Sequence, residues 1–163
     1  MYEYKTTKID ETTLLNMGID PIKCNDYQIL CLPENFERGL KNQLFDAEYT
    51  SDLSKILKQS GIKCANSFDL GIDAHIYVRR SGVIHLGFVW ILDKIVAPLF
   101  VGALINWLSN IRDKDTTEET VKEEIIRLDI RFPCGTEIKY EGNIKSLKEL
   151  LTEELKVSEL YDN

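Results

Sequence analysis

The residue types that most often build catalytic and metal sites are scarce in this chain of 163 residues, which has two histidines and four cysteines. No two cysteines have the spacing of two to four residues that is typical of a zinc knuckle. The phosphate-binding patterns G-x-x-x-x-G-K-[ST] and G-x-G-x-x-G are absent, and no serine or cysteine lies in a recognisable nucleophile motif. The sequence therefore predicts no cofactor and no nucleotide-binding loop.

The cysteine content is also too low for a disulfide scaffold. We expect reduced and mostly buried thiols, with Cys24 and Cys31 as the only bridge between near neighbours that merits a test. The first residues, MYEYKTTKIDET, lack the apolar stretch of a signal peptide. A cytoplasmic location is the resulting expectation.

Positive charge is in deficit, because 20 basic residues face 27 acidic ones and leave a formal net charge of −7. A charge of that sign repels phosphate backbones, so we expect no general binding of nucleic acid. Apolar residues make up 44% of the chain, which is ordinary for a globular protein. With this length, the composition predicts one globular domain over residues 1–163.

Several segments have the pattern of strands. Residues 27–32 are predicted to form a buried strand, and residues 83–91 are apolar enough to be covered on both faces. Apolar and polar residues alternate over 72–79, so we predict a half-buried strand that forms a hairpin with 83–91. A second hairpin is predicted from 126–132, which has one wet face, and 136–141.

Two amphipathic helices are predicted as well. One begins at a Ser51 cap and ends before Gly61, and the other follows Gly142 with Asn143 or Ser146 as its cap. The order of elements favours an α+β fold, with a mixed, mostly antiparallel sheet, a central apolar helix over about 95–112 and a C-terminal amphipathic helix.

The central helix contains an unbroken run of eleven apolar residues from Ile95 to Ile105. A spanning helix needs about 20 apolar residues, whereas this stretch has 14 before Ser109. Asp93 suits the N-terminal end of the helix, and Pro98 is tolerated only in its first turn. These features favour a helix of the core or of a protein interface over a membrane span.

Asp129, Glu137 and Lys139 form the sharpest catalytic candidate. An aspartate followed by Glu-x-Lys on a strand resembles the active-site pattern of the PD-(D/E)xK nucleases. The resemblance implies carboxylates that hold a divalent metal and a lysine that activates water. The alternative is that these are the outward charges of an alternating strand.

A second candidate involves both histidines of the chain. In the predicted hairpin His75 and His85 lie across from each other, and Asp73 projects from the same face as His75. This arrangement suggests a metal site or an acid–base pair. The alternative is two sheet-facing imidazoles with ordinary hydrogen bonds.

The apolar content of residues 83–108 exceeds what a short helix and a hairpin usually need, which suggests a binding surface. Its expected anchors are aromatic, since aromatic side chains dominate contact energy. They are Phe88, Trp90, Phe100 and Trp107. Arg79 and Arg80, at the predicted hairpin tip, are candidates for contact with an acidic partner.

Two segments, VAPLFVGALINWLSN and IKYEGNIKSLKELL, resemble small uncharacterised accessory proteins of bacterial defence or conflict loci. The resemblance implies a subunit that is not an enzyme. Our leading hypothesis is therefore an accessory, adaptor or immunity-type protein that binds another protein or itself. A metal-dependent nuclease and a membrane-active effector are the alternatives.

Overall fold

A computed structural model describes residues 2–6, 14–15, 18–36, 43–78, 82–115, 125–133 and 135–161, with the backbone alone for 2–6, 112–115 and 157–161. The helices are α2 (Pro21–Cys24), α3 (Thr50–Gln59), the 3₁₀ turn η1 (Lys94–Val96), α4 (Ala97–Asp115) and α5 (Ile144–Tyr161). The strands are β1 (Tyr2–Thr6), β2 (Ile29–Leu32), β3 (Phe45–Ala47), β4 (Cys64–Ala65), β5 (His75–Tyr77), β6 (Val83–Ile91), β7 (Ile125–Arg131) and β8 (Thr136–Gly142).

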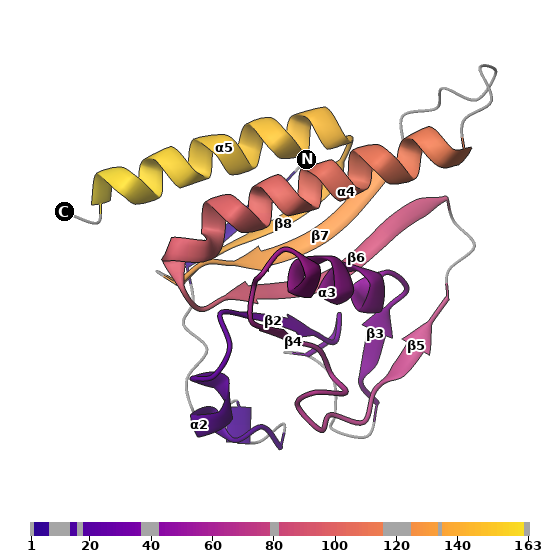
Figure 1. The fold of residues 1–163 in the computed structure, drawn as a ribbon, viewed down its shortest axis with the longest axis vertical. Coiled ribbons are helices and arrows are strands. Elements are labelled where there is room, and N and C mark those ends of the chain that lie inside the picture. The colour runs from indigo at the N-terminus through magenta and orange to yellow at the C-terminus, as the bar shows by residue number, and fades with distance from the viewer. Residues whose placement is uncertain are drawn as a thin grey trace.

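The main sheet has six strands in the order β1-β8-β7-β6-β2-β4 (Figure 1). Antiparallel pairs join β1 to β8, β8 to β7 and β6 to β2, and parallel pairs join β7 to β6 and β2 to β4. The predicted α+β class is confirmed, with its mixed and mostly antiparallel sheet, central apolar helix and C-terminal helix.

The predicted hairpin of residues 72–79 with 83–91 is wrong. Strand β5 is only three residues long, is exposed throughout, and pairs in parallel with β3 in a separate two-stranded sheet. The two edges of β6 are already taken by β2 and β7, so β5 has no edge of that strand left to join. An alternating pattern identifies a strand but not its neighbour.

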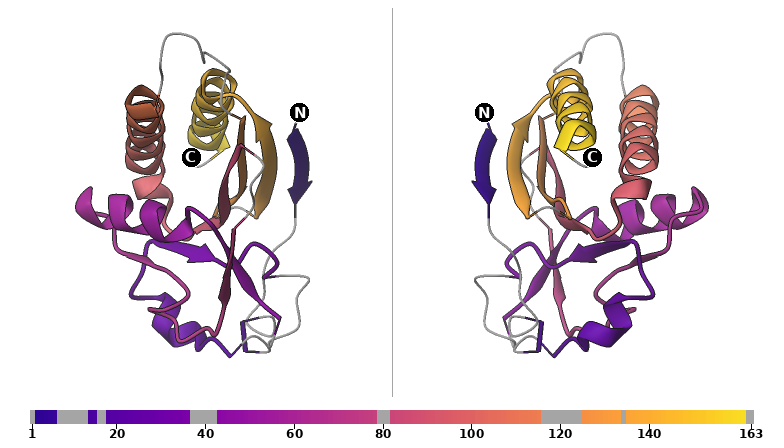
Figure 2. Two further views of the ribbon diagram at one scale, coloured as in Figure 1. Left: turned by 90° about the vertical axis from the view of Figure 1, so that its right-hand side faces the viewer. Right: turned by 90° about the vertical axis from the view of Figure 1, so that its left-hand side faces the viewer.

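The connection from β6 to β7 is a crossover, because the two strands are parallel neighbours and α4 lies between them in the chain. Asp93 begins it as predicted, with its side chain accepting a hydrogen bond from the Ile95 amide at 3.0 Å. Pro98 falls in the first turn of α4, where its missing amide hydrogen breaks no helical bond. Helices α4 and α5 then lie over the same face of the sheet (Figure 2).

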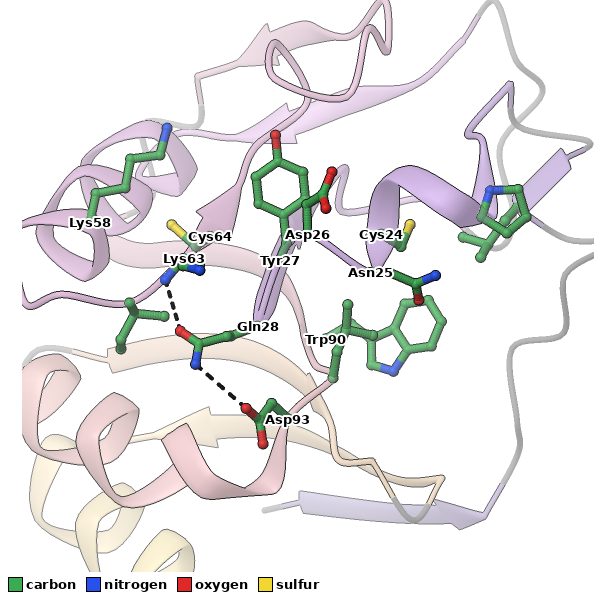
Figure 3. A pocket seen from close by; sticks show the side chains of 14 residues that line it. Cys24, Asn25, Asp26, Tyr27, Gln28, Lys58, Lys63, Cys64, Trp90 and Asp93 are labelled. Carbon is green, nitrogen blue, oxygen red and sulfur yellow. Dashed lines mark hydrogen bonds between the residues drawn. The ribbon is translucent and has the colours of Figure 1, made fainter.

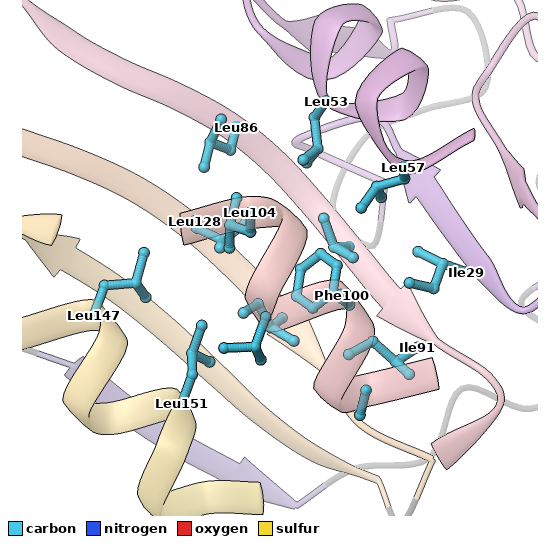
Figure 4. Close-up of a cluster of buried hydrophobic side chains, with 14 of the residues drawn as sticks. Ile29, Leu53, Leu57, Leu86, Ile91, Phe100, Leu104, Leu128, Leu147 and Leu151 are labelled. Carbon is cyan, nitrogen blue, oxygen red and sulfur yellow. The ribbon is translucent and has the colours of Figure 1, made fainter. Parts of the chain in front are cut away.

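The larger hydrophobic cluster fills the space between these helices and the sheet (Figure 4). Residues at the spacing of successive helical turns supply it from α3, α4 and α5, as expected for helices that bury one stripe. Among its fully buried members are Leu53, Leu57, Phe100, Leu104, Leu108, Leu147 and Leu151. The predicted stripe of the C-terminal helix is confirmed by Leu147, Leu150 and Leu151, which are all buried.

A second cluster lies on the opposite face of β2 and β6, where α2 and the following segments cover Leu30, Leu32 and Phe88. Because side chains alternate along a strand, Cys31 belongs to the first cluster while Cys24 belongs to the second. The Cys24–Cys31 bridge is therefore wrong, since the sheet separates the two thiols.

The helix caps are partly as predicted. Gly61 has φ 86° directly after the Ser60 cap of α3, and the Asn143 side chain accepts a hydrogen bond from the Ser146 amide at 2.8 Å. Ser51 is not a cap, because α3 already begins at Thr50 and its N-cap residue Tyr49 makes no side-chain capping bond.

Gly87 marks an irregularity in the pairing of β6 with β7 and has φ 82°. A Cβ atom there would lie 2.8 Å from Thr50 Oγ1 and 3.2 Å from the Ala47 Cβ. We predict that Gly87→Ala lowers the free energy of unfolding by about 2–4 kcal/mol, because a left-handed backbone and a crowded site both oppose the methyl group.

Chemical denaturation measures this effect, with Gly102→Ala as the matched control. Gly102 is exposed on α4 with no atom within 4 Å of its would-be Cβ, so that variant is expected to gain up to about 1 kcal/mol. Equal stability of the two variants would contradict the role of Gly87.

Candidate functional site

The face of the sheet opposite α4 and α5 carries cross-strand rows of charged side chains. In the register of β7 with β8, Arg127 faces Glu141, Asp129 faces Lys139 and Arg131 faces Glu137. Their neighbours Ile126, Leu128 and Ile130 point the other way, into the core. The predicted alternation of residues 126–132 is therefore confirmed.

This face is not wet along its whole length, however. Arg131 and Glu137 are 1% and 2% exposed and form an ion pair of 2.7 Å from Nη2 to Oε2. The Arg131 guanidinium also lies over the Phe88 ring, 5.5 Å from its centre. A buried pair of this kind compensates two charges that would otherwise be strongly destabilising.

A cavity of about 180 Å³ lies beside this pair. It is lined by Glu34, Asn35, Phe45, Phe88, Arg127, Asp129, Glu137 and Lys139. The structure thus brings together the three residues of the predicted Asp and Glu-x-Lys pattern, and adds Glu34 from the segment after β2.

Desolvation raises the pKa of Asp129 to about 6, although Lys139 and Arg127 oppose that shift through their positive charges. A carboxyl group of this pKa can take up or release a proton near neutral pH. The Glu137 Oε2, by contrast, is occupied by Arg131. Among the described residues, no group of three or more His, Cys, Asp or Glu side chains is placed to hold a metal.

The two histidines do not meet. His75 is exposed on β5, whereas His85 is buried on β6, where it pairs in register with Arg127 of β7. Asp73 is exposed and precedes β5. The facing arrangement predicted for His75 and His85 is therefore wrong, because it depended on a hairpin that the sheet does not contain.

A larger cavity of about 1000 Å³ opens between α2, β2 and the end of α3 (Figure 3). Its lining combines the Trp90 and Tyr27 rings with two thiols, those of Cys24 and Cys64. Gln28 bridges two walls of the cavity through its side-chain amide. The Oε1 atom accepts a hydrogen bond from the Lys63 backbone N–H at 3.0 Å, and the Nε2 atom donates one to Asp93 Oδ2 at 3.5 Å.

Two of the four predicted aromatic anchors lie in the core. Phe100 is fully buried and Phe88 nearly so, which corrects their assignment as contacts for a partner. Trp90 is half-buried at the larger cavity. Trp107 is also half-buried, and the centres of its ring and the Tyr49 ring lie 6.5 Å apart in a T-shaped arrangement. Arg79 and Arg80 lie outside the described residues.

The accessible apolar surface of η1 and α4 lies elsewhere, on residues that were not among the predicted anchors. Ile95 is 79% exposed and Leu99 is 48% exposed, and Pro98 and Gly102 beside them are also exposed. We call these four residues the α4 strip. The polar Asn106 could have indicated this strip from the sequence. Gly102 and Leu99 lie four and seven residues before Asn106, and residues at these spacings share one face of a helix.

By length and composition alone, Lys94–Ile111 is apolar enough to cross a membrane. The inward side of this helix, with Phe100, Leu104 and Leu108, is fully buried in the cluster with the sheet. The helix therefore packs on the sheet with one side, and 33% of this window is buried.

The comparisons with known proteins give no relative. No protein family matches the chain, and no curated protein or solved structure matches it at a significant level.

The buried ion pair leads to the first prediction for this site. Glu137→Gln is expected to destabilise the fold by about 3–5 kcal/mol, because it leaves the Arg131 charge buried without its counter-charge. Urea denaturation measures the change. Glu141→Gln, at an exposed position four residues along the same strand, is the control and is expected to change stability by less than about 1 kcal/mol. A small effect at Glu137 would show that water reaches the pair.

The raised pKa of Asp129 leads to a prediction about how stability depends on pH. Its folded pKa of about 6 lies above the unfolded value, so the folded state binds the proton more tightly and loses stability as the pH rises from about 4 to 6. Asp129→Asn is expected to remove this loss, and to stabilise the fold at pH 7 by at most about 3 kcal/mol.

Denaturation curves between pH 4 and pH 8 test this expectation. Asp26→Asn, at an exposed position, is the control and keeps the wild-type profile. A steeper fall of stability with pH in the Asp129 variant would contradict the desolvation argument.

Proposed function

We propose that this protein is a non-enzymatic interaction subunit, and that it associates with a second copy of itself through the α4 strip. The observation that carries this proposal is the exposure of Ile95 on η1 and of Leu99 on α4, a helix whose opposite side is fully buried. Four uncharged surface positions, one on η1 and three on the first turns of α4, favour a contact that excludes water.

A second copy suits the strip because a two-fold contact would place the same four residues against each other. Apolar side chains would then meet apolar side chains, with no unpaired charge among them. Gly102 has open space around it, so a second helix could approach the backbone of α4 closely there.

The net charge of the chain opposes such a contact at long range. Two copies of charge −7 repel each other, and salt screens that repulsion over about 10 Å at 0.1 M. Association through an uncharged strip should therefore tighten as salt is added, whereas association through ion pairs would weaken.

The wider role that we propose is that of an accessory, adaptor or immunity-type protein of a bacterial complex. Its support is the resemblance of segments 96–110 and 138–151 to accessory proteins of bacterial defence or conflict loci. A cytoplasmic location fits the free thiols of Cys24, Cys31 and Cys64.

The alternatives have less support. A metal-dependent nuclease needs an available Glu137 carboxylate, and that carboxylate is bonded to Arg131. A membrane-active effector would have to withdraw Phe100 and Leu104 from the core before α4 could span a bilayer. Exposed Ile95 and Leu99 could touch a membrane surface without unfolding, so vesicle binding is included in the test below.

The test is the double variant Ile95→Asp/Leu99→Asp, studied by sedimentation velocity and light scattering over a range of concentrations. Burial of each side chain is worth about 1.5–3 kcal/mol, so the dimer dissociation constant is expected to rise at least about 100-fold. The wild-type dimer is expected to tighten between 50 mM and 500 mM salt.

The matched control is Phe68→Asp, because Phe68 is 89% exposed on the turn after β4 and lies outside the strip. This variant is expected to dimerise like the wild type. A strictly monomeric wild type at high concentration would overturn the proposal. Flotation with anionic vesicles by a monomeric wild type would instead favour the membrane alternative.

A further inference from the structure

The smaller cavity, of about 180 Å³, is built on the charged face of the main sheet. Its floor comes from three adjacent strands, because Phe88 of β6 lies opposite Asp129 of β7, and Asp129 lies opposite Lys139 of β8. Side chains two residues apart on a strand share a face, so Arg127 and Glu137 join the same floor. Helices α4 and α5 lie on the other side of the sheet, so this cavity is separate from the α4 strip (Figure 2).

The wall of the cavity is held by hydrogen bonds between the segment after β2 and the start of β3. The Glu34 amide donates to the Phe45 carbonyl oxygen at 2.9 Å, and the Phe45 amide donates to Asn35 Oδ1 at 3.0 Å. The Asn35 Nδ2 atom donates to the Gln43 carbonyl oxygen at 2.9 Å. These bonds form the wall without help from a ligand, and a preformed wall lowers the ordering cost of binding.

The charges that line the cavity are balanced. Arg131 neutralises Glu137 through the ion pair of 2.7 Å. The other charged groups of the lining are two carboxylates and two cations, those of Glu34, Asp129, Arg127 and Lys139. A ligand with a single charge would meet groups of its own sign there. A zwitterion presents one positive and one negative group, so it complements both halves of the lining.

Asp129 is the group in this lining whose charge is least compensated. Lys139 and Arg127 act on its carboxylate through their charges, without a hydrogen bond to it among the described residues, and burial outweighs them and raises its pKa to about 6. A ligand ammonium group would supply the missing donors and favour the ionised carboxylate. A carboxylate on the same ligand would then face Arg127, two residues away on β7, and Lys139, opposite on β8.

The size and the apolar part of the cavity limit the ligand further. A water molecule takes about 30 Å³ in the liquid, so a volume of 180 Å³ has room for roughly six waters or for one organic molecule of that bulk. Phe45 and Phe88 supply the apolar part of the lining, which suits a short side chain on the ligand. The smallest α-amino acids combine this bulk with both charges.

We propose that this cavity binds a small zwitterionic α-amino acid, with its ammonium group on Asp129 and its carboxylate on Arg127 and Lys139. The site is independent of the α4 strip, so the variant Ile95→Asp/Leu99→Asp should bind the amino acid like the wild type.

An NMR titration of the full chain with L-alanine tests the proposal. Saturable shifts are expected at the amides of β7 and β8, with a dissociation constant below about 1 mM. N-acetyl-L-alanine lacks the ammonium charge and L-alaninamide lacks the carboxylate. Because each has lost one of the two charge-assisted contacts, each is expected to bind at least about 10-fold more weakly than L-alanine.

Variants assign the two charges of the ligand to their partners. Asp129→Asn is expected to weaken L-alanine binding at least about 10-fold, and it should fold because it removes a charge that burial disfavours. Arg127→Gln should weaken the binding of L-alanine but not that of L-alaninamide, which has no carboxylate for the guanidinium to hold. Asp26→Asn and Lys148→Gln, at exposed positions outside this cavity, are the matched controls and should bind like the wild type.

Three results would overturn the proposal. One is the absence of saturable shifts with glycine, L-alanine and L-serine up to about 10 mM. Another is equal affinity for L-alanine and for either blocked analogue, which would indicate a site for a simple cation or a simple anion. The third is unchanged L-alanine binding by folded Asp129→Asn protein.

Discussion

The packing of α4 against the parallel strands β6 and β7 determines most of this structure. A parallel connection must cross one face of the sheet, so the chain after Ile91 has to lay an apolar helix over the strands it has just left. Phe100 and Leu104 fill the resulting interface. Once α4 is in place, α3 and α5 pack beside it on the same face, and the opposite face of β7 and β8 carries the charged side chains.

The division between two faces explains why polar groups gather where they do. Alternation sends Ile126, Leu128 and Ile130 toward the helices and Arg127, Asp129 and Arg131 away from them. The segment with Asn35 and Phe45 then covers part of this second face, which removes water from Asp129 and Glu137. Charges placed there by strand periodicity must be paired or must shift their pKa. Arg131 and Glu137 are an example of pairing, and Asp129 is an example of a shifted pKa.

Local sequence signals predicted where helices and strands form better than they predicted which strands pair with each other. Asp93, Pro98 and Gly61 mark helix ends through backbone geometry that depends on adjacent residues only, and all three predictions are confirmed. The pairing of β5 with β3 depends on which edges of the main sheet are already occupied, and no property of residues 72–79 encodes that. The burial of Arg131 and Glu137 also needed contacts from Phe88, far away in the chain.

The candidate binding surface could be assigned from the sequence to a segment, residues 83–108, but not to particular residues. An apolar run of eleven residues gives no polar face from which to tell the buried side from the outer side. Two of the four aromatic residues chosen as anchors, Phe88 and Phe100, are buried by the chain itself, because large apolar groups gain most from leaving water. The residues left outside, Ile95 and Leu99, are aliphatic and sit where no segment among the described residues covers them. A surface of this kind is what remains after the core has formed.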